Sequence, residues 1–234
     1  MVFIDTIRNL RKPVTVKNTV QKKHSPRLLG EYLSCSRGSI RIAMQKKHEA
    51  KALGNKQKRI GEILVDLDMI REEDLRNALR QQRADRIGLC PVFESLSRTE
   101  LIGIGNYFSE VSLTADNQFI FEGKNDPTLY ILVGGKLEVF TKDHDGNEIH
   151  IAFVNPIEPI GEMGYFQDGI RTASVRTVIP TELLSSGYKN LTHYFEHVPH
   201  VAHAFLSVIN LRQAETIQRI KEAQNQHHGI VPFN

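Results

Sequence analysis

The sequence predicts an α+β fold, in which a small helical N-terminal module precedes an antiparallel β jelly-roll barrel with a closing C-terminal helix. Three patterns indicate this: helical periodicity in the first third, period-two apolar alternation in the middle, and a helical apolar stripe near the end. A chain of 234 residues can form one large or two small domains with buried cores.

Charge divides the chain and indicates two modules with different partners. Residues 1–60 carry fifteen Lys and Arg against three acids, a net charge of +12. The whole chain carries +3, so the remaining 174 residues sum to −9. The basic part favours an anionic partner, unless it docks on the acidic part or only adds solubility. We expect three segments: a basic N-terminal segment (1–26), a helical module (27–88) and the barrel domain (89–234).

A weak repeat organises the helical module. Leu29-Gly30-Glu31 recurs as Ile60-Gly61-Glu62, and a helical stretch follows each copy. The helix after the second copy is clearly marked, because acids at 72–74 favour its first turn. The repeat therefore predicts two similar helical units.

This repeat resembles the small N-terminal domain of type II secretion and type IV pilus ATPases, in which two such units form a cyclic di-GMP site. Leu28 stands where the first arginine is expected, and Asp68 replaces the second glycine of the second copy. Binding of cyclic di-GMP and docking of a protein therefore both stay open. The residues that the resemblance implies for cyclic di-GMP are Arg27, Gly30, Arg59, Ile60 and Gly61.

Strand signals follow in the middle of the chain. Four stretches read as strands: Phe119–Gly123, Leu129–Gly135, Lys136–Phe140 and Glu148–Val154. Asp145-Gly146 marks a hairpin turn before the last of them. Even spacing of strands and turns favours an antiparallel barrel or jelly roll over alternating β and α units.

The stretch from Gly161 to Thr177 holds a carboxylate and a guanidinium nine positions apart, at Glu162 and Arg171. Gly161 and Gly164 let the backbone approach a ligand, and the amides of a short following helix can face an anion. Arg171 can make a bidentate contact with a phosphate, and Glu162 can accept a hydrogen bond from a sugar 2′-hydroxyl. These groups suit a cyclic phosphodiester on a ribose.

The order of parts resembles the cyclic-nucleotide-binding domains of catabolite activators, protein kinase A regulatory subunits and cyclic-nucleotide-gated channels. It comprises Pro91-Val92-Phe93, a strand ending in Glu122-Gly123, a Tyr-Ile strand at Tyr130, the glycine-flanked cassette and a long closing helix. The resemblance covers about residues 89–226. Two departures, Ile160 before the Gly-Glu pair and Tyr165 after Gly164, remove no polar ligand.

The resemblance implies a ligand and a set of site residues. The run from Arg171 to Arg176 is similar to that of pacemaker-type channels, which prefer cAMP and tolerate cGMP. We therefore expect cAMP, with cGMP second. The expected ligand-binding residues are Ile160, Gly161, Glu162, Met163, Gly164, Arg171, Thr172, Ala173, Val175, Arg212 and Arg219.

The closing helix is expected from about Pro199 to Ala223, with a wide apolar stripe that includes Phe205, Ile217 and Ile220. It can cap the nucleotide base, pair with its copy in a homodimer, or both. The chain ends soon after it, at Asn234, so we expect no DNA-reading module.

No phosphate-binding Walker loop, Ser-His-Asp order, metal-ligand cluster or paired-carboxylate site is recognisable in the sequence, so we expect a binding protein and not an enzyme. Two isolated cysteines, no membrane-spanning apolar run and no signal core indicate a cytoplasmic location.

The interpretation that follows is a bacterial signalling adaptor that senses a cyclic nucleotide and acts on an unidentified partner protein. A nucleotide-independent scaffold with a vestigial cassette is the main alternative. A basic nucleic-acid binder is a further alternative, although the first 88 residues have few aromatic side chains.

Overall fold

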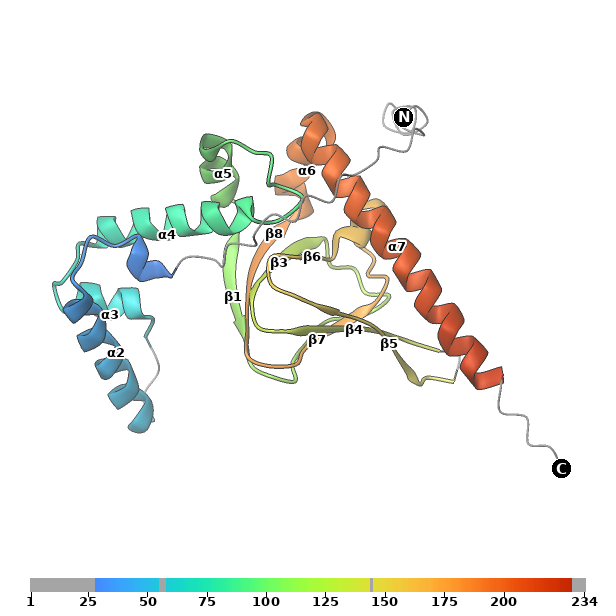
Figure 1. Cartoon of the computed structure of the whole chain (residues 1–234), viewed down its shortest axis with the longest axis horizontal. Helices are drawn as coiled ribbons and strands as arrows, with labels where there is room; N and C mark the ends of the chain where they lie inside the picture. The colour runs from blue at the N-terminus through green and yellow to red at the C-terminus, as the bar shows by residue number, and fades with distance from the viewer. Residues whose placement is uncertain (1–27, 55–57, 144, 229–234) are drawn as a thin grey trace.

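The structure, a computed structural model, describes residues 28–54, 58–143 and 145–228, with side chains up to residue 222. The predicted segment 1–26 and the candidate Arg27 lie outside the described residues. Within the described ranges, helices flank an antiparallel barrel, and the long helix α7 runs diagonally across one side of it (Figure 1). The predicted α+β class is confirmed.

The elements follow one another in the order helices, barrel, helices. The helices are η1 (Leu29–Glu31), α2 (Arg37–Ala52), α3 (Ile60–Asp66), α4 (Glu72–Gly88), α5 (Arg98–Gly105), η2 (Glu162–Gln167), α6 (Tyr188–His197) and α7 (Pro199–His228). The strands are β1 (Ser109–Leu113), β2 (Gln118–Ile120), β3 (Thr128–Gly134), β4 (Leu137–Lys142), β5 (Glu148–Val154), β6 (Pro159–Ile160), β7 (Ser174–Thr177) and β8 (Thr181–Gly187).

Two four-stranded sheets form the barrel, in the orders β1-β8-β3-β6 and β2-β7-β4-β5. The described pairings are antiparallel, as the jelly-roll prediction requires. β5 has the predicted bounds, but β2 is shorter than predicted. Its chain leaves the sheet after Ile120, because Lys124 closes a turn on Phe121 and Gly123 adopts φ +74°.

One helix, α4, contributes to two hydrophobic cores. Leu75 and Ala78 pack in the cluster of the N-terminal helices, whereas Ala84 and Ile87 lie in a cluster with α5, β3, β8, α6 and α7. A third cluster fills the barrel between the sheets. The boundary that we predict at residue 88 coincides with the end of α4, yet the core of the C-terminal part begins within that helix.

The closing helix starts at Pro199, as predicted, and extends to His228, beyond the expected Ala223. α6 precedes it, and the two helices are joined by stacked rings of Phe195 and Phe205, whose centroids are 3.9 Å apart. Among the described residues, no helix combines the length and the apolar character needed to cross a bilayer.

Candidate functional site

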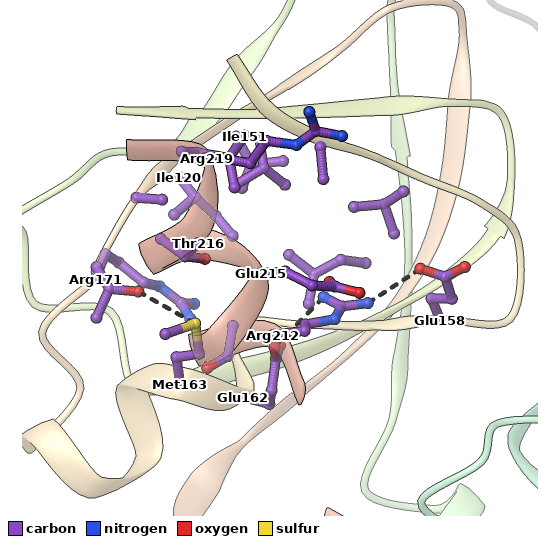
Figure 2. Close-up of a pocket in the computed structure, with 18 of the residues that line it drawn as sticks. Ile120, Ile151, Glu158, Glu162, Met163, Arg171, Arg212, Glu215, Thr216 and Arg219 are labelled. Atoms are coloured by element: carbon purple, nitrogen blue, oxygen red, sulfur yellow. Dashed lines mark hydrogen bonds and ion pairs between the residues drawn. The ribbon is translucent and has the colours of Figure 1, made fainter. Parts of the chain in front are cut away.

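A cavity of about 590 Å³ lies between the barrel and α7 (Figure 2). All eleven residues that the sequence predicts for the nucleotide site line it. Further lining residues come from β5, the loop before β6, and α7; they include His150, Phe153, Glu158, Glu215 and Thr216. The fold therefore brings residues from positions 160–175 and 212–219 into one space.

The cassette turn depends on Gly161. Its φ is +86°, and a Cβ at this position would lie 2.0 Å from a guanidinium nitrogen of Arg171 and 2.8 Å from the Thr128 carbonyl oxygen. No side chain fits such a position without displacing both neighbours. The short helix predicted after it is the 3-10 helix η2, and Asp168, the residue that follows it, adopts a left-handed conformation. Gly161 thus permits the close approach of the turn and Arg171.

Arg171 is buried, with 3% of its surface exposed, and makes five hydrogen bonds. Its Nε and one terminal nitrogen donate to Asp126 at 3.3 and 2.7 Å, and the same terminal nitrogen donates to the Thr128 carbonyl at 2.7 Å. The other terminal nitrogen donates to the Gly161 carbonyl at 3.1 Å and to the Tyr188 hydroxyl at 3.2 Å. Since a guanidinium has five N–H donors, a phosphate that pairs with Arg171 must replace one of these partners.

Tyr188 links the cassette to the start of α6. Its hydroxyl accepts from Arg171 and donates to the Gly161 carbonyl. Burial raises the pKa of Tyr188 to about 12, with Arg171 acting in the opposite direction. The hydroxyl therefore keeps its proton and its role as donor across the physiological range.

Glu162 is 2% exposed, so its carboxylate is removed from solvent. Burial raises its pKa above the ordinary value of 4.5, while the nearby Arg212 and Arg171 favour the charged form and limit the rise. A buried acceptor of this kind suits one well-placed donor, such as a hydroxyl.

Arg212 connects α7 to the cassette. Its terminal nitrogens lie 3.1 Å from Glu158 and 3.4 Å from Glu162, and Figure 2 shows it between the two carboxylates. The side chain is only 20% exposed, so these pairs are more shielded from salt than surface pairs. Arg212, one of the predicted ligand-binding residues, therefore holds two cavity carboxylates.

The other end of the cavity is more open. Arg219, one of the predicted residues, has a 60% exposed side chain and pairs with Glu222 at 3.3 Å within α7. In the cassette, Thr172 directs its hydroxyl at the Met163 sulfur, 3.7 Å away. A ligand can replace both contacts at small cost, because the Arg219 pair is exposed and a thioether sulfur is a weak acceptor.

Two of the predicted cyclic di-GMP residues, Gly30 and Gly61, allow close helix packing. A Cβ on Gly30 would lie 2.8 Å from the Ile40 side chain, and one on Gly61 would lie 2.4 Å from Leu75. The following acid of each repeat accepts from a backbone N–H at the start of its helix, Glu31 at 3.0 Å and Glu62 at 2.9 Å. The repeat thus has a clear structural role, with Ile60 as the first residue of α3 and Arg59 paired with Glu110.

Three residues of the site escaped the sequence reasoning: Asp126, Glu158 and Tyr188. Each lies outside the cassette and reaches it through the fold, as a partner of Arg171 or Arg212. Asp126 directly precedes Pro127 in the turn before β3, a position that the sequence does not distinguish from an ordinary turn acid. Within the described ranges, no group of three or more His, Cys, Asp or Glu side chains is placed to hold a metal ion.

Comparison with known proteins assigns this region. The family model of the cyclic nucleotide-binding domain matches residues 110–197. The Cyclic AMP receptor protein of Thermus thermophilus is 28% identical over 141 residues, covering 58% of this chain and 65% of that protein. The cAMP-activated global transcriptional regulator CRP of Escherichia coli is 32% identical over 83 residues, 35% of this chain and 40% of the relative. The chain thus spans 40 to 65% of the length of these two relatives.

Solved structures show the same fold. The Thermus thermophilus Catabolite Activator Protein is 26% identical with a TM-score of 0.51, over 57% of this chain and 63% of that one. A regulatory subunit of a cAMP-independent protein kinase A from Trypanosoma cruzi has a TM-score of 0.52 at 15% identity, over 72% of this chain and 56% of that one. The resemblance of residues 27–88 to secretion ATPases stays a prediction. Residues 110–197 thus match the cyclic nucleotide-binding domain family.

Proposed function

We propose that the protein is a cytoplasmic cyclic-nucleotide sensor that prefers cAMP and transmits its binding to a partner protein, without catalysing a reaction. The observation that carries the proposal is the cavity in which all eleven expected residues meet, with Glu162 and Arg171 both buried. A buried guanidinium and a buried acceptor on one turn suit a ligand that carries both a phosphate and a hydroxyl.

In the proposed complex, Arg171 pairs with the cyclic phosphate and Glu162 accepts from the ribose 2′-hydroxyl. Asp126 acts as a positioning residue, because it holds two nitrogens of the Arg171 guanidinium. Arg212, Arg219 and other α7 residues line the remaining space, where the base would lie. The names of the two curated relatives, which refer to cAMP, support the choice of cAMP over cGMP.

Transmission would run through α7. This helix contributes Arg212 to the cavity and Phe205 to the core that also contains Ala84 and Ile87 of α4. A ligand shifts such an arrangement only if it binds two positions of the helix with different affinity. The N-terminal helices pack on the first half of α4. They would then expose or hide the surface to which the partner protein binds.

The alternative is a nucleotide-independent scaffold, and one observation favours it. The polar groups of the site are paired without a ligand, since Arg171 makes five hydrogen bonds to four protein residues and Glu162 pairs with Arg212. A ligand must then compete with these contacts. The scaffold proposal expects no thermal shift with any cyclic nucleotide.

Calorimetric titration with cAMP, cGMP and cyclic di-GMP tests the proposal. We expect saturable binding of cAMP, weaker binding of cGMP, and a lower affinity for both nucleotides in Arg171→Ala. Absence of heat with both mononucleotides in a folded protein would favour the scaffold. A response to cyclic di-GMP is a separate part of the proposal: Arg59→Ala should weaken that binding alone and leave cAMP binding unchanged.

A further inference from the structure

The N-terminal helices and the barrel meet at a polar junction. The hydrophobic cluster of η1, α2, α3 and the first half of α4 is separate from the cluster in which the second half of α4 packs. Continuity of α4 is therefore the main apolar link between the two parts. Among the described residues, the side-chain ion pair that joins α3 to the barrel is Arg59 with Glu110 of β1.

Two arginines lie close to the Glu110 carboxylate, one near each oxygen. One oxygen is held by Arg59, and the other lies 3.9 Å from a terminal nitrogen of Arg83 on α4. Arg83 is itself fixed, because its other terminal nitrogen donates to the Gly105 carbonyl at 3.1 Å. If Arg59 leaves, Arg83 can keep the carboxylate paired, so that no buried charge is left uncompensated.

The two partners of Glu110 differ in exposure. The Arg59 side chain is 57% exposed, whereas those of Glu110 and Arg83 are 20% and 23% exposed. An ion pair with one partner this exposed contributes little to stability and is screened by salt. The pair can therefore fix an orientation while remaining easy to break.

A second polar contact stands at the same junction. The Tyr32 hydroxyl donates to Asp85 of α4 at 2.7 Å, and the other Asp85 oxygen pairs with Arg98 of α5. The carboxylates of Glu110 and Asp85 thus each bind one group from the N-terminal helices and one group from the part of the chain that packs with the barrel. Such paired polar contacts define one seating of the N-terminal helices.

We propose that Arg59 and Glu110 form a releasable latch that seats the N-terminal helices on the barrel, with Arg83 as the arginine that takes over Glu110 on release. Release lets α2 and α3 shift on the first half of α4, where they pack, and frees the Arg59 guanidinium. Arg59, Arg83 and Glu110 lie outside the lining of the cavity, and the test below needs no nucleotide, so failure of the latch can be told apart from failure of the proposed function.

Spin-label distance measurements on the full chain test the latch. One label is placed on α2 at Lys46→Cys and one on α6 at Asn190→Cys, both exposed positions. Cys35 is replaced by serine, whereas Cys90 can stay, because burial raises its pKa to about 12 and leaves it unreactive. The parent protein should give one narrow distance distribution at low salt.

Arg59→Ala and Glu110→Gln should each broaden or shift this distance distribution. Salt at about 1 M should broaden or shift the distribution of the parent protein, but not those of the two variants. The backbone N–H of residue 59 keeps its bond to Glu62, so α3 should retain its start in Arg59→Ala. Arg71→Ala is the matched control, since it removes an arginine–carboxylate pair that lies wholly at the start of α4.

An unchanged distribution in both Arg59→Ala and Glu110→Gln would overturn the latch, as would equal broadening in Arg71→Ala. Circular dichroism checks that the helices stay folded. If Arg59→Ala loses helix, Glu110→Gln decides, because it alters only the barrel side of the contact.

Discussion

The Arg212 guanidinium on α7 lies 3.4 Å from the buried Glu162 carboxylate of the cassette. The closing helix therefore contacts the acceptor that a ribose hydroxyl would use. A ligand that donates to Glu162 changes what Arg212 can bind, and Glu158, 3.1 Å away, remains as its other partner. This exchange of partners by Arg212 explains how a bound ligand would change the contacts that fix α7 to the cassette.

The first prediction concerns the two polar residues of the cassette. Arg171→Ala should weaken cAMP binding by about 2–5 kcal/mol, since it leaves a phosphate charge unpaired in a buried site. Glu162→Ala should cost less, about 1.5–3 kcal/mol, for one hydrogen bond to a charged acceptor. Titration calorimetry measures both values.

Arg176→Ala is the control for these variants. Arg176 lies on β7, pairs with Glu138 and Glu148, and is absent from the cavity lining. The Arg176→Ala variant should bind cAMP with the same affinity as the parent protein. If all three variants bind cAMP as the parent does, the cassette is not the site.

The second prediction concerns pH. Burial raises the pKa of Glu162 in the folded protein above 4.5, so the folded state binds a proton that the unfolded state has already lost. The resulting stability is fully present below about pH 4.5 and is lost as pH rises through the folded pKa. Nucleotide affinity has the opposite dependence, because the ribose hydroxyl needs the charged acceptor, and it should fall as pH drops through that pKa.

Chemical unfolding and calorimetry over the same pH range separate these effects. The side chain in Glu162→Gln cannot titrate. The unfolding free energy and the nucleotide affinity of this variant should therefore both depend less on pH in the window above pH 4.5. Identical slopes in parent and variant would assign the pH dependence to other groups.

Sequence reasoning succeeded where residues act close to their neighbours in the chain. The Gly161–Arg171 turn, the hairpin at Gly146 and strand β5 are all specified by residues a few positions apart. Period-two alternation and turn glycines are enough to predict such elements. The confirmed α+β class follows from these local signals.

The sequence did not predict contacts between residues that lie far apart in the chain. Asp126 reaches Arg171 from 45 positions away, and Arg212 reaches Glu158 from 54. Such contacts depend on how the sheets close and on where α7 crosses them, which no local pattern records. For the same reason, the role of α4 in two cores became visible only in the structure.

The third prediction isolates the close approach at Gly161. Gly161→Ala should destabilise the protein and weaken cAMP binding at least tenfold, or about 1.4 kcal/mol, because its Cβ would collide with Arg171. Gly146→Ala is the matched control, with φ of +85° against +86° but no atom within 4 Å of the added Cβ. It should carry only the backbone cost of roughly 1–2 kcal/mol in unfolding free energy.

Thermal or chemical unfolding measures the stability of both variants, and calorimetry measures their affinity. Gly146→Ala should bind cAMP normally. Equal affinities in the two alanine variants would mean that the packing of Gly161 against Arg171 does not shape the ligand site.

The last prediction concerns α7 as transmitter. Truncation after Leu211 removes Arg212, Thr216 and Arg219 but keeps the cassette and the Phe205 contact with α6. Part of the cAMP affinity should remain, because the proposed phosphate and ribose contacts are retained. Any cAMP-dependent change in scattering mass or in the α2–α6 label distance should disappear. Truncation after Lys221 is the control, since it keeps every cavity residue of α7 and should switch as the full chain does. If the shorter chain still switches normally, α7 beyond Leu211 is not part of the mechanism, and the cassette turn, through Tyr188 and α6, becomes the transmitter.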